Sequence, residues 1–325
     1  MQNEAFLRVT VISGLPGAGK SVVARALRGT DRPAGHVADQ SAVELVVEAP
    51  PAVSPFDTAD FLAAESELRH GDAREAYLGD LVSVIDASRF WSNLYDDAAV
   101  PGETDASRTV ADALVEQIEW ASVVVINKVD LVPRAVRGDI RDFVRLLNPS
   151  TFIVFSEQGE GAADSWPAPR PNILEWLGRS PGWVRQLNGD ALLSQSPQGL
   201  SCVVYRDVRP FHPGRLAAFF AEHSRESGDI LRSRGLFRLA SRPGVVGSWS
   251  SVGDTVTLEP TQMLSHDPES PWGQEIAFFG RNLEVNRLTQ NLNACLLSDT
   301  EFLSGPVQWC AATDPFPEWD LQHRH

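Results

Sequence analysis

Residues 14–21, with the sequence GLPGAGKS, have the types and spacing of a phosphate-binding loop. Glycines let the backbone curl so that several N–H groups point at one anion, and a helix that begins behind them adds its positive dipole end. A lysine at this position neutralises the β- and γ-phosphates of a nucleotide, and the serine hydroxyl binds Mg²⁺. The expected nucleotide-binding residues are Gly14, Gly17, Ala18, Gly19, Lys20 and Ser21. Among them, Lys20 is expected to be catalytic and Ser21 to contact Mg²⁺ through the nucleotide.

A second polar group, Asn127-Lys128-Val129-Asp130, follows the apolar run VVVI and resembles the NKxD signature of GTPases. A carboxylate such as that of Asp130 accepts two hydrogen bonds from N1–H and the 2-amino group of guanine, a pattern that adenine lacks. Lys128 is expected to lay its aliphatic stem along the base, and Asn127 to tie its loop to the phosphate-binding loop. We therefore expect all three side chains to take part in binding GTP.

Each motif also has a plain structural alternative. The first could be a Gly-rich turn that matches by chance, and the second a polar loop after a strand. The 28 basic residues of the chain include only two lysines, Lys20 and Lys128, and each stands in one of the motifs. An arginine is a wide planar fork rather than a compact ammonium group, so the retention of lysine at these positions supports the functional interpretation.

The elements around the motifs predict a parallel sheet. The run LRVTVIS at 7–13 predicts a buried strand, and the residues after Ser21 a helix that ends near Gly29. Apolar runs also end at Asn127 and at Asp86, and the carboxyl ends of parallel strands face one ligand crevice. Asp86 could face that crevice or cap the turn that follows it, and capping is the favoured interpretation.

The pattern of elements predicts two domains. Residues 1–178 are expected to form an α/β P-loop domain with a mostly parallel sheet. Residues 179–199 are rich in Ser, Gly, Gln and Pro and are expected to be a linker, and residues 200–325, with several short strands and two helices, a smaller α+β domain. Within it, His212 is expected to cap or pack rather than to bind metal, and Trp249 and Phe237 to lie in the core.

Composition limits the possible partners and compartment. The net charge of -15 argues against a nucleic-acid partner, since such proteins carry a basic face. No apolar run reaches the ~20 residues that a membrane span needs, and the N-terminus lacks the features of a signal peptide. The cysteines at 202, 295 and 310 form no disulfide pattern, so a cytoplasmic location is expected.

Several segments together resemble the CobW-like family of GTPases, which includes zinc metallochaperones and metalloenzyme activators. They are the two motifs above with the segments LVSVIDASRF, YRDVRPFHPGRL, SRGLFRLASRPGVVGSWSSVGDTVTLEP and QEIAFFG. The resemblance implies a cytoplasmic GTPase that uses GTP and Mg²⁺. It also implies that the protein hands a metal ion, with Zn²⁺ the foremost candidate, to a client metalloprotein or helps a metalloenzyme to mature.

The chain departs from this family at its metal-binding motif and at its first switch. The family carries a CxCC motif, but here no cysteine precedes Cys202, so no zinc ligand can be assigned. The segment RGTDRPAGHVADQSA at 28–42 is much shorter than the corresponding part of the family. It keeps Thr30 and Asp31, which could reach Mg²⁺, and His36 and Asp39 as possible metal ligands.

A second departure concerns the strand that ends in ExxG in the family. In VELVVEAPP at 43–51, Glu48 matches the glutamate, but Pro51 stands where the glycine is expected. The glycine N–H would sense the γ-phosphate, and proline has no N–H to offer. Glu48 is therefore either a catalytic residue, which holds a Mg²⁺-bound water or polarises the attacking water, or a strand-end acid that faces solvent.

These observations favour a GTP-binding protein, and more specifically a GTPase of the metallochaperone or metalloenzyme-maturation type. The alternative is a degenerate nucleotide-binding scaffold or assembly protein with little hydrolysis and no metal transfer, because the switch segment is short and Pro51 lacks an N–H. A third hypothesis is an interaction protein whose second domain does the work. The sequence does not identify the client, the metal or the oligomeric state.

Overall fold

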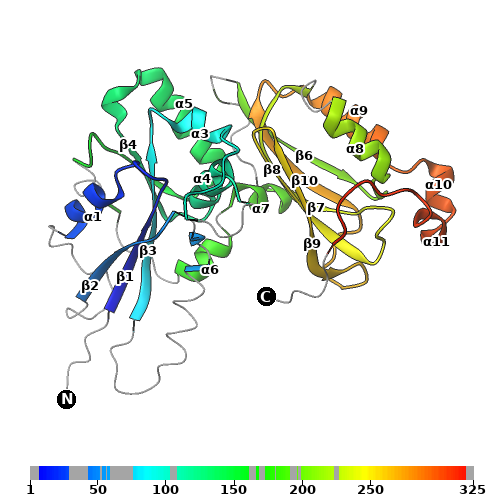
Figure 1. Cartoon of the computed structure of the whole chain (residues 1–325), viewed down its shortest axis with the longest axis horizontal. Coiled ribbons are helices and arrows are strands. Elements are labelled where there is room, and N and C mark those ends of the chain that lie inside the picture. The colour runs from blue at the N-terminus through cyan, green and yellow to red at the C-terminus, as the bar shows by residue number, and fades with distance from the viewer. Residues whose placement is uncertain are drawn as a thin grey trace, which may run out of the picture. The chain divides into compact units, whose positions relative to one another are not determined.

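The computed structural model describes residues 7–28, 43–51, 53–55, 57–58, 76–102, 108–160, 166–167, 173–179, 181–190, 196, 199–222 and 227–319. The chain divides into two compact units, Met1–Gly182 and Trp183–His325, which are described separately here (Figure 1). In the described part of the chain, no helix is long and apolar enough to span a membrane.

The first unit is built on a five-stranded sheet in the order β2-β1-β3-β4-β5, in which every neighbouring pair is parallel. The strands are β1 (Leu7–Ser13), β2 (Val43–Glu48), β3 (Ala76–Asp86), β4 (Val123–Asn127) and β5 (Phe152–Phe155). All five residues of β4 are buried, as expected for an inner strand of a parallel sheet. Because all five strands run the same way, their carboxyl ends lie along one edge of the sheet.

Helices cover both faces of this sheet. They are α1 (Lys20–Arg28), α3 (Phe90–Leu94), α4 (Val110–Glu119), α5 (Arg134–Leu147) and α6 (Ile173–Gly178), with a short 3₁₀ helix η1 (Val129–Leu131). Ile12 of β1 packs in one apolar cluster with Leu27 of α1, whereas Val11 packs in another with Leu177 of α6. Successive residues of a strand point to opposite faces, so α1 and α6 lie on opposite sides of the sheet.

The second unit contains a five-stranded antiparallel sheet in the order β6-β10-β7-β8-β9. Its strands are β6 (Leu200–Asp207), β7 (Asp229–Phe237), β8 (Val245–Val252), β9 (Thr255–Leu264) and β10 (Gln274–Arg281). Its helices are α8 (Pro213–Glu222), α9 (Val285–Cys295), α10 (Asp299–Leu303) and α11 (Pro306–Trp309), and α7 (Gly182–Leu187) lies at the boundary of the two units, inside the range expected to be a linker. The predicted fold class, an α/β domain followed by a smaller α+β domain, is confirmed.

Three side chains of the second unit take the expected structural roles. Trp249 and Phe237 are 1% and 0% exposed and lie in one aromatic core. The imidazole Nδ1 of His212 accepts a hydrogen bond from the backbone N–H of Arg215 at 3.4 Å, which places His212 at the N-terminus of α8 as a cap. Burial, and then the nearby Arg215, lower the pKa of His212 below its usual value, so the capping nitrogen stays unprotonated at neutral pH.

Candidate functional site

The loop between β1 and α1 has a conformation that only glycine accommodates at two positions. Gly19 has a φ of +102°, and a Cβ there would overlap the side-chain amide of Asn127. A Cβ on Gly14 would lie 2.5 Å from the carbonyl oxygen of Val84 in β3. The sequence GLPGAGKS is therefore matched to a tight loop that presses against the carboxyl ends of β3 and β4.

This loop presents backbone donors that have no partner among the described residues. The N–H groups of Gly17, Gly19, Lys20 and Ser21 make no hydrogen bond with any described residue. The next two N–H groups, those of Val22 and Val23, both donate to the carbonyl of Gly19, at 3.1 and 3.2 Å, and so fix the end of the loop to the first turn of α1. Unpartnered N–H groups at the start of a helix form an anion site, and a phosphate group fits their donor chemistry.

The ammonium group of Lys20 lies against the same loop. Its Nζ donates to the carbonyl oxygen of Gly14 at 2.6 Å and to that of Leu15 at 3.4 Å. Burial lowers the pKa of Lys20, and the negative charge of Glu48 opposes that shift. A half-buried ammonium group held by carbonyl oxygens alone can exchange those bonds for bonds to a phosphate.

Glu48 and Ser21 are brought together across the sheet edge. The hydroxyl of Ser21, in the first turn of α1, donates to Oε2 of Glu48 at the end of β2, at 2.8 Å. The parallel register of β1 with β2 pairs Ile12 with Glu48 and so brings Glu48 to the level of the loop. A hydroxyl and a carboxylate are both hard oxygen ligands, a donor set that suits Mg²⁺.

Asn127 links the phosphate-binding loop to a loop that the sequence analysis missed. Its Nδ2 donates to the carbonyl of Ala18 at 2.9 Å, and its Oδ1 accepts from the N–H of Gly159 at 2.9 Å. Gly159 and Gln158 follow β5 and have φ angles of +87° and +53°. The turn signal SEQG directly after the apolar run FIVF could have indicated that this loop also ends at the carboxyl edge.

The ammonium group of Lys128 contacts both the phosphate-binding loop and Asp86 at the end of β3. Its Nζ donates to the carbonyl of Gly17 at 2.7 Å and to Oδ2 of Asp86 at 2.6 Å. The other oxygen of Asp86 accepts from the N–H and hydroxyl of Ser88, at 2.9 and 2.6 Å, so Asp86 caps the turn as favoured and also faces the site. Burial alone would raise the pKa of Asp86, but the bonds from Lys128 and Ser88 outweigh it and hold the pKa below its usual value.

Asp130 lies in the loop that follows β4. It is exposed, and its carboxylate makes no hydrogen bond or ion pair with the described residues. Lys128, two residues before it, has a left-handed φ of 58°, which turns the chain sharply after β4. The carboxylate of Asp130 therefore has no partner among the described residues, and its loop is tied to the phosphate-binding loop by Asn127 and Lys128.

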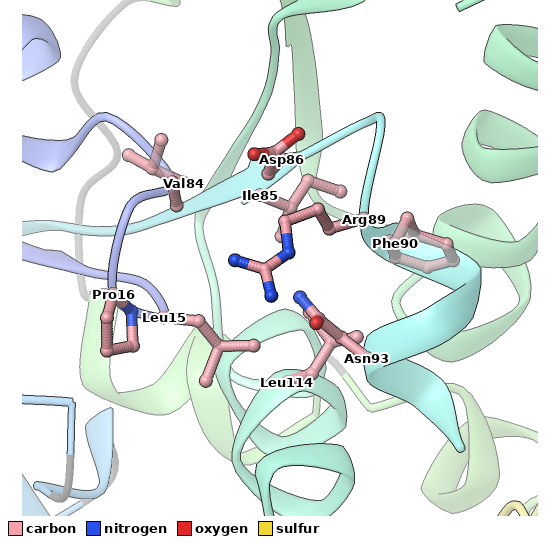
Figure 2. A pocket seen from close by; sticks show the side chains of 10 residues that line it. Leu15, Pro16, Val84, Ile85, Asp86, Arg89, Phe90, Asn93 and Leu114 are labelled. Carbon is pink, nitrogen blue, oxygen red and sulfur yellow. The ribbon is translucent and has the colours of Figure 1, made fainter. Parts of the chain in front are cut away.

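A small, open recess borders the phosphate-binding loop (Figure 2). Its walls come from the loop, the end of β3, α3 and α4. They include Leu15 and Pro16 on one side and Asp86, Arg89 and Asn93 on the other. Sequence reasoning singled out neither Arg89 nor Asn93.

The remaining candidate metal ligands of the sequence belong to the segment at 28–42. Thr30, Asp31, His36 and Asp39 all lie outside the described residues. Within the described ranges, no three His, Cys, Asp or Glu side chains gather closely enough to hold a metal ion.

Two family models match the chain. Residues 35–155 match the model described as CobW/HypB/UreG, nucleotide-binding domain, and residues 200–296 match the cobalamin synthesis protein cobW C-terminal domain. The phosphate-binding loop precedes the first matched segment, so its assignment depends on its own sequence and geometry.

Individual relatives are distant. The chain is 27% identical over 273 residues to "Zinc-regulated GTPase metalloprotein activator 1" of Dictyostelium discoideum, which covers 73% of the chain and 56% of that protein. The chain thus spans about half the length of this curated relative. The Zn(II)-bound YjiA GTPase of E. coli is 13% identical over 90% of the chain and 99% of that structure, with a TM-score of 0.32. The GDP-bound NFeoB E67A mutant of S. thermophilus is 13% identical over 67% of the chain and 70% of that structure, with a TM-score of 0.28.

Proposed function

Because the chain belongs to the CobW family, with a CobW/HypB/UreG nucleotide-binding domain followed by a cobW C-terminal domain, we propose that it binds and hydrolyses GTP. The observation that carries this proposal is a set of N–H groups without a partner among the described residues, at Gly17, Gly19, Lys20 and Ser21, with the Lys20 ammonium group beside them. Such a set has the charge and the donors for the β- and γ-phosphates of a nucleotide.

The proposed role of each side chain follows from its contacts. Lys20 would exchange its bonds with backbone carbonyls for bonds to the β- and γ-phosphates. Ser21 and Glu48 would hold Mg²⁺, directly or through a water molecule. When bound, this ion neutralises phosphate charge. Catalysis of this kind consists mainly of positioning and electrostatic stabilisation, which Lys20 would supply from the protein side.

Guanine recognition is assigned to the loop after β4. The free, exposed carboxylate of Asp130 would accept hydrogen bonds from guanine N1–H and the 2-amino group. Asn127 and Lys128 would keep this loop in register with the phosphate-binding loop through their bonds to Ala18 and Gly17. Gly14 and Gly19 would let the backbone of the phosphate-binding loop approach β3 and Asn127 closely enough for these bonds to form.

The finer proposal is a role in metal delivery or metalloenzyme maturation, with a metalloprotein as client. It is supported by the printed name of the Dictyostelium relative, a zinc-regulated GTPase metalloprotein activator. In this chain, any Zn²⁺ would have to use ligands other than a CxCC motif, because the first cysteine is Cys202. A cytoplasmic location belongs to the same proposal.

A nucleotide-binding scaffold with little hydrolysis is the second candidate, and Pro50-Pro51 favours it. These residues follow Glu48 with Ala49 in between, and they supply no N–H to a γ-phosphate. A scaffold of this kind would keep GTP and GDP affinity while turnover stays near the uncatalysed rate.

Hydrolysis measured with and without Zn²⁺ tests the proposal. We expect Mg²⁺-dependent release of phosphate from GTP that falls at least about 100-fold in Lys20→Ala, because the charge on the transferring phosphoryl group loses its main protein cation. Arg179→Ala is the matched control, since Arg179 forms only an exposed ion pair with Glu175 in α6. Turnover near background with GTP still bound would favour the scaffold, and equal turnover in Lys20→Ala would contradict catalysis at this site.

A further inference from the structure

Arg89 lies at the turn between β3 and α3, next to the phosphate-binding loop. It lines the recess together with Leu15, Pro16 and Ala18 of that loop. Figure 2 shows its guanidinium group directed into the recess, on the side where Leu15 and Pro16 lie. The backbone N–H of Arg89 donates to the carbonyl of Asp86 at 3.2 Å, which fixes the start of the side chain at the carboxyl edge of the sheet.

The charge of Arg89 is not used by the rest of the described protein. Its guanidinium group makes no hydrogen bond or ion pair with the described residues, and neither does the side-chain amide of Asn93 across the recess. Lys128, by contrast, is neutralised by Asp86 at 2.6 Å. Arg89 is exposed, and an arginine carries five donors and always keeps its charge. What distinguishes Arg89 from other exposed arginines is its position at the recess beside the phosphate-binding loop, where its donors can contact an anion.

The described residues that follow β2 offer no free N–H group to a terminal phosphate. After Glu48, the N–H of Ala49 is already bonded to the carbonyl of Ile12 at 2.8 Å, and Pro50 and Pro51 have no N–H. The N–H of Val53 is bonded to the carbonyl of Pro50 at 3.2 Å. None of these four residues can therefore donate to a γ-phosphate without giving up an existing bond.

We propose that Arg89 reaches past Pro16 to contact the terminal phosphate of a bound nucleoside triphosphate. This inference rests on the proposed function and adds a residue and a ligand preference to it. Lys20 and the loop N–H groups would contact the β-phosphate, which GTP and GDP share, as well as the γ-phosphate. Arg89 would contact only the γ-phosphate, which the triphosphate alone carries. Arginine forms paired, charge-assisted hydrogen bonds with phosphate oxygens and stabilises the charge of a transferring phosphoryl group.

Calorimetric titration of the full chain with GDP and with the non-hydrolysable guanosine 5′-[β,γ-imido]triphosphate, both with Mg²⁺, tests this. We expect Arg89→Ala to lose about tenfold in affinity for the triphosphate analogue and less than about twofold for GDP. Arg89→Lys should recover part of the loss, because it restores the charge but not the paired geometry. Arg25→Ala is the control, since Arg25 is an exposed arginine of α1 with no partner among the described residues.

The outcomes separate this inference from the proposed function. If Arg89→Ala binds both nucleotides as tightly as the wild type, or loses equal affinity for both, the γ-phosphate contact is overturned while GTP binding stands. If the wild type binds neither nucleotide, the proposed function fails and the inference fails with it. A triphosphate-specific loss in Arg89→Ala that Arg25→Ala does not share supports the contact, because loss of folding would lower both affinities together.

Discussion

The hydroxyl of Ser21 and the carboxylate of Glu48 are joined by a 2.8 Å hydrogen bond although they stand 27 residues apart. One is in the first turn of α1 and the other ends β2, so the bond connects the phosphate-binding loop to the strand beside it. The pair places a hydroxyl and a carboxylate near Lys20, whose ammonium group interacts with the charge of Glu48. If this pair serves Mg²⁺, its removal should affect turnover more than nucleotide binding.

Glu48→Gln should separate these two effects. The amide oxygen of glutamine can still accept the Ser21 hydrogen bond, but the negative charge is lost. We expect GTP affinity within about threefold of wild type and a hydrolysis rate lower by about 100-fold, as for loss of a general base or a metal-orienting carboxylate. Single-turnover hydrolysis of GTP at saturating Mg²⁺ measures the rate. An unchanged rate would show that Glu48 has no catalytic role and is only an acidic residue at the end of β2.

Gly19→Ala should damage the loop. The φ of +102° strains any residue with a side chain, and the new Cβ would overlap the amide of Asn127. We expect about 1–3 kcal/mol of lost unfolding free energy and a loss of affinity for both GTP and GDP. The control is Gly138→Ala in α5, where a Cβ meets nothing within 4 Å and should leave the unfolding free energy unchanged or raise it. Equal stability of the two variants in urea would contradict the described loop.

Asp130→Ala should relax base selection. Removing the carboxylate leaves guanine N1–H and the 2-amino group without an acceptor, whereas adenine never used it. We expect the ratio of GTP to ATP affinity to fall by at least about 100-fold, since two hydrogen bonds to a charged group are lost. Competition binding with both nucleotides measures the ratio, with Asp97→Ala, an exposed acid elsewhere in the unit, as control. If Asp130→Ala does not change the ratio of GTP to ATP affinity, Asp130 does not recognise the base.

The Asp86–Lys128 pair should make stability depend on pH in a defined direction. The pKa of Asp86 is held below its ordinary value of 3.8, so its charged form stabilises the folded state. This contribution is complete above the unfolded pKa and is lost as the pH falls through the lower, folded pKa. We expect Asp86→Asn to be less stable than wild type by about 1–2 kcal/mol at pH 7.

The test of this prediction is urea unfolding of both proteins between pH 7 and pH 3. The difference in unfolding free energy should stay constant down to about pH 4 to 5 and then narrow as the wild-type carboxyl becomes protonated. A difference that instead narrows toward higher pH would contradict the assigned direction of the pKa shift.

Local patterns predicted the elements and the two motifs because those signals lie within a few residues of one another. One contiguous segment predicts the strand, loop and helix around Lys20. Another contiguous segment predicts the strand that ends at Asn127. The grouping of several short strands with two helices likewise indicated an α+β second domain, although it did not indicate that the sheet of this domain is antiparallel. The fold class could therefore be predicted from the sequence.

Contacts between distant residues could not be predicted in this way. The Asp86–Lys128 ion pair spans 42 positions and depends on the register of β3 against β4, where Asp86 pairs with Asn127. The Asn127–Gly159 bond likewise depends on β5 ending at the same edge. The short helices α10 and α11 were missed, because four to five residues carry too little periodicity. Arg89 was not predicted because only the folded structure brings it next to Leu15 and Pro16 of the phosphate-binding loop.

Calorimetric titration of the wild-type chain with GTP, GDP and ATP, each with Mg²⁺, tests the central claim most directly. The account predicts that GTP and GDP bind at the phosphate-binding loop, that ATP binds at least about 100-fold more weakly, and that Lys20→Ala abolishes the heat of GTP binding. Tight ATP binding without a preference for GTP, or GTP binding that survives unchanged in Lys20→Ala, would contradict it.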